Sequence, residues 1–289
     1  MEINITNEYS KLEKVVVCKA DYYDENKVAI NNETIKYYKE NGGVPTKEDI
    51  LREQKYFWEV LQSRGIELLV ADQVDGVKGQ MFTRDLAFVI GDTFFISNMK
   101  KENRKKAIDG WDKIISSLDQ KKIVQVPSDI YLEGGDVLVD KNKIYVGISE
   151  RTNLDGVNFL KSVLDDQYEI IPLYLKPTFL HLDVVFTIVD EGLAIVYKDG
   201  LDDASYALLK DFEKIEITKE EQFSLATNVF VIDKKCVIVN ESHERLQKVL
   251  QEYGFLVLPV MLAETAKDGG AFRCTTCPLL RIDKVSHKI

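Results

Sequence analysis

The chain has 289 residues, of which 45% are hydrophobic, so it can bury a large core and is not expected to be disordered. Its net charge of −10, without a dense Lys/Arg cluster, argues against nucleic acid as a partner and suits a small cationic one. No run approaches the roughly 20 apolar residues of a membrane span, and four unevenly spaced cysteines do not form a disulfide framework. We therefore expect a cytoplasmic protein in a reducing compartment, with residues 1–289 forming a single domain.

The chain begins with a strand, a helix and a second strand. Residues 11–19 predict a buried strand, residues 47–64 carry apolar side chains at helical spacing, and residues 66–70 return to a strand pattern. Residues 20–46 are polar and contain glycine, which favours a mobile cover over a site.

One pattern then recurs at a period of roughly 50 residues, a spacing typical of propellers and other repeat architectures. Each unit has two short β-rich runs, a helical segment and a third strand. The paired runs are expected at 85–97, 134–147, 182–198 and 227–240. The helices are expected at 101–118, 151–164, 203–212 and 242–252, and the third strands at 122–126, 168–173, 214–218 and 255–260.

The two ends of the chain complete the pattern. The first unit has only one strand of its pair, and a β-prone run from Cys274 to Leu280 is left over at the other end. Pairing these two segments closes five units into a ring whose central channel is lined by loops and strand ends. The alternative is an ordinary mixed α/β sheet in which the repetition is coincidental.

Polar residues interrupt the apolar pattern at the edges of these units: Asp85 in MFTRDLAF, Glu133 before two glycines, His181 and Asp183 in FLHLDVVF, and Cys274 in DGGAFRCTT. On a strand, the histidine and the aspartate two residues later would point to the same face. Taken singly, each residue has an ordinary interpretation as a cap, a turn residue, a core histidine or an inert cysteine. At equivalent edges of a ring, however, they would converge on one pocket.

Such a pocket suits attack on a guanidinium group. Asp85 and Asp183 could each bind this planar cation by two parallel hydrogen bonds, which would fix its central carbon above Cys274. The bound cation favours the thiolate, which is the nucleophilic form of cysteine. His181 would protonate the departing amine and then activate water, with Glu133 orienting the imidazole. We therefore expect a small cationic guanidino substrate, no cofactor and no metal ion.

Other interpretations of these residues are weaker. Cys274 and Cys277 have the spacing of a redox or zinc pair, but a redox pair is expected to open a helix, and zinc needs further ligands. We therefore expect Cys277 to be structural.

Five motifs, taken in chain order, resemble the motif series of the pentein, or amidinotransferase, superfamily: FTRD, LEGGDV, SERT, HLDVVFT and RCTTCPLLR. The superfamily includes arginine deiminases, dimethylarginine dimethylaminohydrolases and glycine amidinotransferases. The resemblance extends along nearly the whole chain and implies a five-bladed α/β propeller with a Cys/His/acid active centre.

The resemblance also implies roles for individual residues. Cys274 matches the nucleophile, His181 and Glu133 match the acid–base pair, and Asp85 and Asp183 match the guanidinium clamps. Arg151, in SERT, matches a position similar to one that holds the substrate carboxylate in arginine deiminases.

The implied activity is hydrolysis at the guanidino carbon of arginine or a methylated arginine through a covalent Cys thiouronium intermediate. The chain length is similar to that of the dimethylarginine hydrolases, whereas Asp183 and the FTRD motif are more similar to the motifs of the arginine deiminases. An amidinotransferase and a non-catalytic binding propeller stay open as alternatives, as do the choice of guanidino compound and a homo-oligomeric state.

Overall fold

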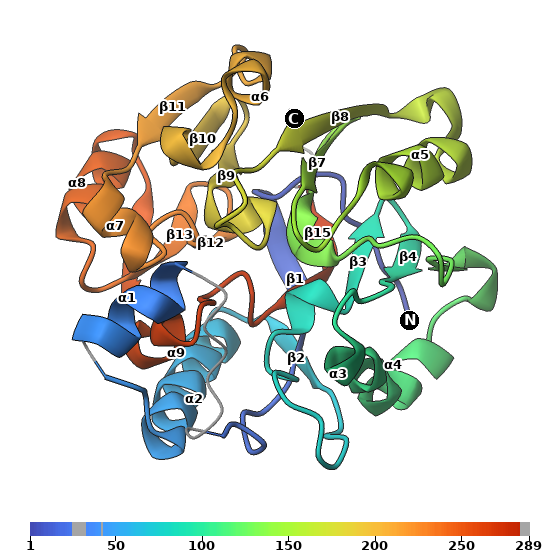
Figure 1. Ribbon diagram of the computed structural model, residues 1–289, viewed down its shortest axis with the longest axis horizontal. Helices are drawn as coiled ribbons and strands as arrows, with labels where there is room; N and C mark the ends of the chain where they lie inside the picture. The colour runs from blue at the N-terminus through green and yellow to red at the C-terminus, as the bar shows by residue number, and fades with distance from the viewer. Residues whose placement is uncertain (25–32, 42, 284–289) are drawn as a thin grey trace, which may run out of the picture.

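The structure is a computed structural model that describes residues 1–24, 33–41 and 43–283. Within these residues, five three-stranded sheets surround a central axis (Figure 1). Each sheet has one antiparallel pair and a third strand that pairs in parallel. The sheets contain β1 (Lys11–Val17), β2 (Glu67–Val70) and β15 (Cys277–Ile282); β3 (Ala87–Ile90), β4 (Thr93–Ile96) and β5 (Ile123–Gln125); β6 (Val137–Asp140), β7 (Lys143–Ile148) and β8 (Glu169–Tyr174); β9 (Phe186–Asp190), β10 (Leu193–Val196) and β11 (Glu213–Glu216); and β12 (Phe230–Asp233), β13 (Cys236–Asn240) and β14 (Leu256–Val260).

The predicted closure of the ring by the two ends of the chain is confirmed. β15 pairs antiparallel with β1, and β1 pairs in parallel with β2. The buried side chain of Arg281 strengthens this joint, because its Nη1 donates to the Ser10 carbonyl at 2.6 Å and its Nη2 to the Val231 carbonyl at 2.7 Å. Pro278 is tolerated within β15 because this strand lies at the edge of its sheet.

The four hairpins of the repeated units have turns of the same length but of two geometries. Each turn has two residues, and in each a single residue has positive φ: Gly91, Lys141, Gly192 and Lys235. Gly91 and Lys141 are the first residues of their turns, whereas Gly192 and Lys235 are the second residues of theirs, in hairpins whose pairing is irregular. The repetition seen in the sequence therefore extends to the length of the turns but not to their backbone conformation.

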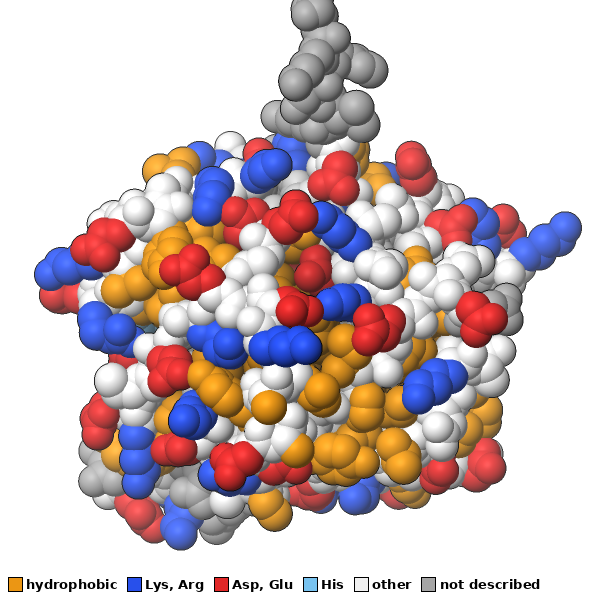
Figure 2. Space-filling view, turned by 90° about the horizontal axis from the view of Figure 1, so that it is seen from above, with side chains coloured by type: hydrophobic (Ala, Val, Ile, Leu, Met, Phe, Trp, Pro, Cys, Tyr) orange, Lys and Arg blue, Asp and Glu red, His pale blue; other side chains and the backbone are white. Residues whose placement is uncertain are grey.

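Helices lie around the five sheets (Figure 1). They are α1 (Glu33–Asn41), α2 (Lys47–Ser63), α3 (Glu102–Lys105), α4 (Asp112–Ser116), α5 (Leu154–Val163), α6 (Asp203–Leu208), α7 (Lys219–Phe223), α8 (Glu244–Glu252) and α9 (Ala263–Lys267). Helix α1 extends far enough inward to line the pocket described below. None of the helices in the described residues is long and apolar enough to cross a membrane. The face in Figure 2 carries interspersed acidic and basic side chains, without an extended basic area.

The prediction of one helix over residues 101–118 is wrong. The segment consists of α3, a 3-10 turn at Lys106–Trp111, and α4. Gly110 lies so close to the preceding loop that a Cβ on it would meet the Asp72 carbonyl oxygen at 2.0 Å, and Trp111 is buried. The chain therefore forms a 3-10 turn here, which packs against that loop. The pattern of charged residues in the sequence gives no sign of this contact.

Three 3-10 turns, at Thr83–Asp85, Gly134–Asp136 and Leu182–Val184, precede β3, β6 and β9 and bring their side chains together at the axis. His181 and Asp183 therefore lie at a turn, and the expectation that they share one face of a strand is wrong. The Leu182 amide donates to Asp136 Oδ1 at 2.9 Å, which holds this turn before the strand begins. Cys274 likewise lies in a turn before β15.

Candidate active site

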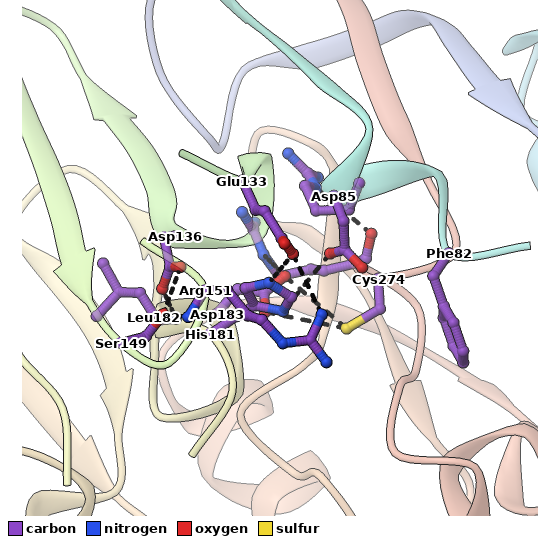
Figure 3. Close-up of polar contacts among 12 residues, drawn as sticks. Phe82, Asp85, Glu133, Asp136, Ser149, Arg151, His181, Leu182, Asp183 and Cys274 are labelled. Carbon is purple, nitrogen blue, oxygen red and sulfur yellow. Dashed lines mark hydrogen bonds and ion pairs between the residues drawn. The ribbon is translucent and has the colours of Figure 1, made fainter. Parts of the chain in front are cut away.

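A pocket of about 190 Å³ lies near the axis of the ring. Asp85, Arg151, His181 and Cys274 line it. Glu133 and Asp183 are fully buried and contact these residues from behind (Figure 3). The structure thus brings all six predicted site residues together, although they come from five distant segments of the chain.

Carboxylates flank both ring nitrogens of His181. Its Nε2 lies 2.8 Å from Glu133 Oε2, and its Nδ1 lies 3.5 Å from Asp85 Oδ1. Burial opposes the charged form of the ring, but the nearby carboxylates outweigh it and raise the pKa of His181 to about 10. The imidazole is therefore protonated at neutral pH and able to act as a general acid.

Glu133 is held by groups other than His181. Its Oε1 accepts a hydrogen bond from the Lys100 amide at 3.0 Å, and its backbone amide donates to Thr152 Oγ1 at 3.1 Å. Arg151 Nη1 lies 3.5 Å from its Oε2. These contacts fix the carboxylate that orients the imidazole.

Cys274 lies beside Asp183. Its Sγ is 3.9 and 4.0 Å from the two carboxylate oxygens. Burial, followed by the charges of Asp183 and Asp85, raises the pKa of the Cys274 thiol well above its usual value. No hydrogen bond joins Cys274 to His181 in the described part of the chain, so the two residues face one pocket without forming a hydrogen-bonded dyad.

Asp85 has an intramolecular partner that the sequence analysis missed. Arg104 Nη1 lies 2.5 Å from Asp85 Oδ2, and Arg104 Nη2 donates to the carbonyls of Gly79 and Phe82. Burial favours the neutral acid, but the charges of His181 and Arg104 outweigh it and lower the pKa of Asp85. Only Oδ1, which is buried and has no hydrogen-bond donor among the described residues, is left for a ligand.

The pocket wall beyond these residues carries charges of both signs. Arg104 and Arg151 line it, and Arg151 Nε and Nη1 are buried without hydrogen-bond partners in the described ranges. Asp268, a second residue that the sequence analysis missed, lines the same wall. Burial raises the pKa of Asp268 to about 7, against the lowering effect of Arg104. Arg104 was missed because it lies in a charged segment typical of a solvated helix face, and Asp268 because the sequence indicates only a flexible entry to the turn of Cys274.

Glycines 134 and 135 are required by close contacts within the ring. A Cβ on Gly135 would meet His181 Cγ at 2.7 Å and Asp85 Oδ1 at 3.0 Å. A Cβ on Gly134 would meet the Arg84 carbonyl oxygen at 2.2 Å. These two glycines therefore let the turn before β6 pack directly against site residues of neighbouring turns.

Several further expectations bear on this site. The Cys277 thiol is buried, donates to the Ala87 carbonyl at 3.1 Å and has its pKa raised to about 12, mainly by burial, which fits a structural role.

The ligand atoms of Asp85, Glu133 and His181 lie within 4.8 Å of one another, close enough to hold a metal ion. Asp85 is paired with Arg104, and Glu133 and His181 are hydrogen-bonded to each other.

The cover expected over residues 20–46 lies partly outside the described residues. Within the described part, Ile35 of α1 lines the pocket, and Tyr37 of the same helix stacks on Phe223 of α7 with ring centroids 4.4 Å apart. This helix therefore forms one wall of the pocket.

Known proteins resemble this chain along most of its length. Residues 20–281 match the family model described as N,N dimethylarginine dimethylhydrolase, eukaryotic. The uncharacterized protein YkgA of Bacillus subtilis is 36% identical over 278 residues, covering 95% of this chain and 94% of that protein. An arginine deiminase of Rhodococcus erythropolis is 24% identical over 250 residues, covering 72% of this chain and 61% of that enzyme.

Solved structures share the fold. The N-terminal domain of ArgZ, an arginine dihydrolase from cyanobacteria solved with its product, has a TM-score of 0.82 at 22% identity, covering 94% of this chain and 98% of that chain. SxtG, an amidinotransferase from Microseira wollei, has a TM-score of 0.81 at 19% identity, covering 99% of each chain. The chain adopts the five-bladed pentein fold and belongs to the N,N-dimethylarginine dimethylhydrolase family within the pentein superfamily.

Proposed function

We propose that this protein hydrolyses the guanidino group of arginine or a methylated arginine, releasing ammonia or an amine and a citrulline-type product. The observation that carries the proposal is the arrangement of Asp85, Glu133 and Asp183 around Cys274 and His181 at the base of one pocket. The family's guanidino-acting relatives support the same class of reaction.

A guanidinium fits between the two aspartates. Asp183 accepts its N–H groups beside Sγ, and Asp85 Oδ1 accepts from the other side. The substrate charge offsets the carboxylates that raise the pKa of Cys274, so that binding itself promotes loss of the thiol proton to solvent. The nucleophile is therefore activated when substrate is bound.

The covalent step then follows from the position of His181. Sγ forms a bond to the guanidino carbon, and the C–N bond to the departing amine breaks as His181 Nδ1 delivers its proton to that amine. The neutral imidazole next takes a proton from water, whose oxygen attacks the same carbon and displaces Sγ. Glu133 stabilises the imidazolium at both stages through its contact with Nε2.

The charged wall of the pocket suits an α-amino acid. Arg104 and Arg151 present guanidinium groups that can bind a carboxylate, and Asp268 presents a carboxylate that can bind an ammonium group. We therefore expect L-arginine to be a better substrate than agmatine, which lacks the carboxylate.

Free arginine should also be preferred over asymmetric dimethylarginine by at least about tenfold in kcat/KM, because two methyl groups remove both N–H donors of one nitrogen. A buried carboxylate left without its partner costs several kcal/mol, whereas burying two methyl groups contributes about 0.8 kcal/mol each. Asp183→Asn should reduce the arginine rate more than the dimethylarginine rate. Kinetics of the parent and variant with both compounds test this, and a parent enzyme that prefers dimethylarginine would show that Asp183 does not clamp that nitrogen.

The pH dependence of kcat/KM should be bell-shaped, with an alkaline maximum. The reaction needs the thiolate of Cys274, so the rate rises as pH rises toward the elevated pKa of this thiol. It also needs protonated His181, so the rate falls as pH passes about 10. Glu133→Gln removes one carboxylate that raises the pKa of His181 and should move the alkaline limb to lower pH. An unmoved limb in the pH–rate profile of this variant would contradict the assignment.

A further inference from the structure

A polar residue or a cysteine lies one to three positions before one strand of each antiparallel pair. These residues are Asp85, Asp136, Asp183, Asn228 and, before β15, Cys274. Asp85 and Cys274 line the pocket, Asp183 contacts Cys274 from behind it, and all three have roles in the proposed reaction. Asp136 and Asn228 have none, yet they too lie just before a strand of their blades.

Asn228 connects the turns on either side of it. Its side-chain Oδ1 accepts hydrogen bonds from the amides of Arg273 at 3.0 Å and Cys274 at 3.3 Å. Its Nδ2 donates to the Asp183 carbonyl at 3.1 Å. The residue is 1% exposed, so water does not replace these bonds readily. One amide side chain therefore links the turn of the nucleophile to the turn of the guanidinium clamp.

The two turns have few other direct links near the reacting atoms. Arg273 Nε lies 3.7 Å from Asp183 Oδ2, while its Nη1 is held 3.0 Å from Glu8 Oε2. The thiol and the Asp183 carboxylate are 3.9 Å apart or more. The three hydrogen bonds of Asn228, at 3.0 to 3.3 Å, are shorter than these direct contacts, so the separation of the two turns depends on Asn228.

This separation matters for the chemistry. Asp183 fixes the guanidinium, and the carbon of that group must lie within bonding approach of Sγ for attack to occur. A displacement of about 1 Å between a bound substrate and its nucleophile costs about 10²-fold in rate. A residue that fixes the position of the Cys274 turn relative to the Asp183 turn therefore affects turnover without contacting the substrate.

We propose that Asn228 is a positioning residue that holds the Cys274 nucleophile at a fixed distance from the Asp183 clamp through its three backbone hydrogen bonds. The catalytic part of this inference rests on the proposed guanidino hydrolysis. The structural part, the hold on Cys274, can be tested without any substrate.

Asn228→Ala should lower kcat/KM for L-arginine by about 10²-fold, chiefly through kcat, because the substrate still binds but is misaligned. Asn240→Ala is the matched control. Asn240 is equally buried in the same blade, and its Oδ1 accepts from the amide and hydroxyl of Ser242, away from the pocket. Urea unfolding midpoints of the two variants should fall by similar amounts, while only Asn228→Ala loses the rate.

Alkylation of Cys274 by iodoacetamide, followed by peptide mass spectrometry, supplies the readout that does not depend on activity. In the parent protein, burial and the neighbouring carboxylates keep this thiol protonated and slow to react. Releasing its turn from Asn228 should let the thiol move away from Asp183, so that alkylation near neutral pH becomes several-fold faster. Cys18, Cys236 and Cys277 should stay protected, and Asn240→Ala should alkylate like the parent.

Slower turnover together with faster, selective alkylation of Cys274 would support the positioning role. Parent-like turnover and alkylation in folded Asn228→Ala would overturn it, as would loss of protection at all four cysteines, which indicates a general structural role. If the parent enzyme converts no guanidino compound, the proposed function fails, while the alkylation comparison still decides whether Asn228 holds Cys274.

Discussion

Replacing Cys274 with serine should abolish turnover of every guanidino substrate while the protein stays folded. A serine hydroxyl is far less acidic than a thiol and stays protonated near neutral pH, and His181, being itself protonated, cannot remove its proton. The exchange of sulfur for oxygen changes little packing in the turn before β15, so the expected loss of stability is small.

The measurement compares steady-state release of ammonia or amine with the urea unfolding midpoint of the same preparations. Cys277→Ser is the matched control, because this second buried cysteine lies three residues further on and its thiol donates to the Ala87 carbonyl. The control should retain most of the parent rate. Substantial turnover by Cys274→Ser would end the covalent mechanism.

His181→Ala should slow the first half of the reaction, in which solvent must replace His181 as the proton donor to the departing amine, and should stop the reaction before hydrolysis. Attack on the cationic substrate can still proceed, because the guanidinium is already polarised by Asp85 and Asp183. Hydrolysis of the adduct then lacks the base that activates water. We expect release of at most one amine per enzyme, followed by a stall, and accumulation of the adduct.

Single-turnover assays of amine and ureido product separate the two stages. His243→Ala is the control: His243 is buried, its Nε2 lies 2.8 Å from Ser224 Oγ, and burial lowers its pKa to about 4. It is therefore neutral and structural, and its loss should leave the stoichiometry of the two products unchanged. Equal, sustained release of both products by His181→Ala would contradict the acid–base role.

The ring could be predicted because its signal is repeated. Four hairpin, helix and strand units and the unpaired end segments suffice to predict closure of β1 on β15, and the structure has this pairing. The spacing of apolar residues along the chain indicates which side chains are buried, and every blade has such spacing. The family motifs likewise identified residues that converge on one pocket.

The details that were missed depend on contacts between distant segments. Arg104 lies 19 residues after Asp85 in a charged segment, and only the fold reveals that its guanidinium occupies one oxygen of that carboxylate. The turn at His181 exists because Asp136, from the preceding blade, accepts the Leu182 amide. A local pattern of apolar and polar residues cannot distinguish this turn from the start of a strand.

The central claim is that the guanidino carbon is transferred to Cys274. The most direct measurement is to incubate His181→Ala with L-arginine labelled at the guanidino carbon, quench with acid, and map the label by peptide mass spectrometry. The account predicts an adduct one ammonia lighter than the substrate, located on the peptide that contains Cys274 and absent when Cys274 is also replaced by serine. Turnover by the parent enzyme without labelled Cys274 under any quench condition would contradict it.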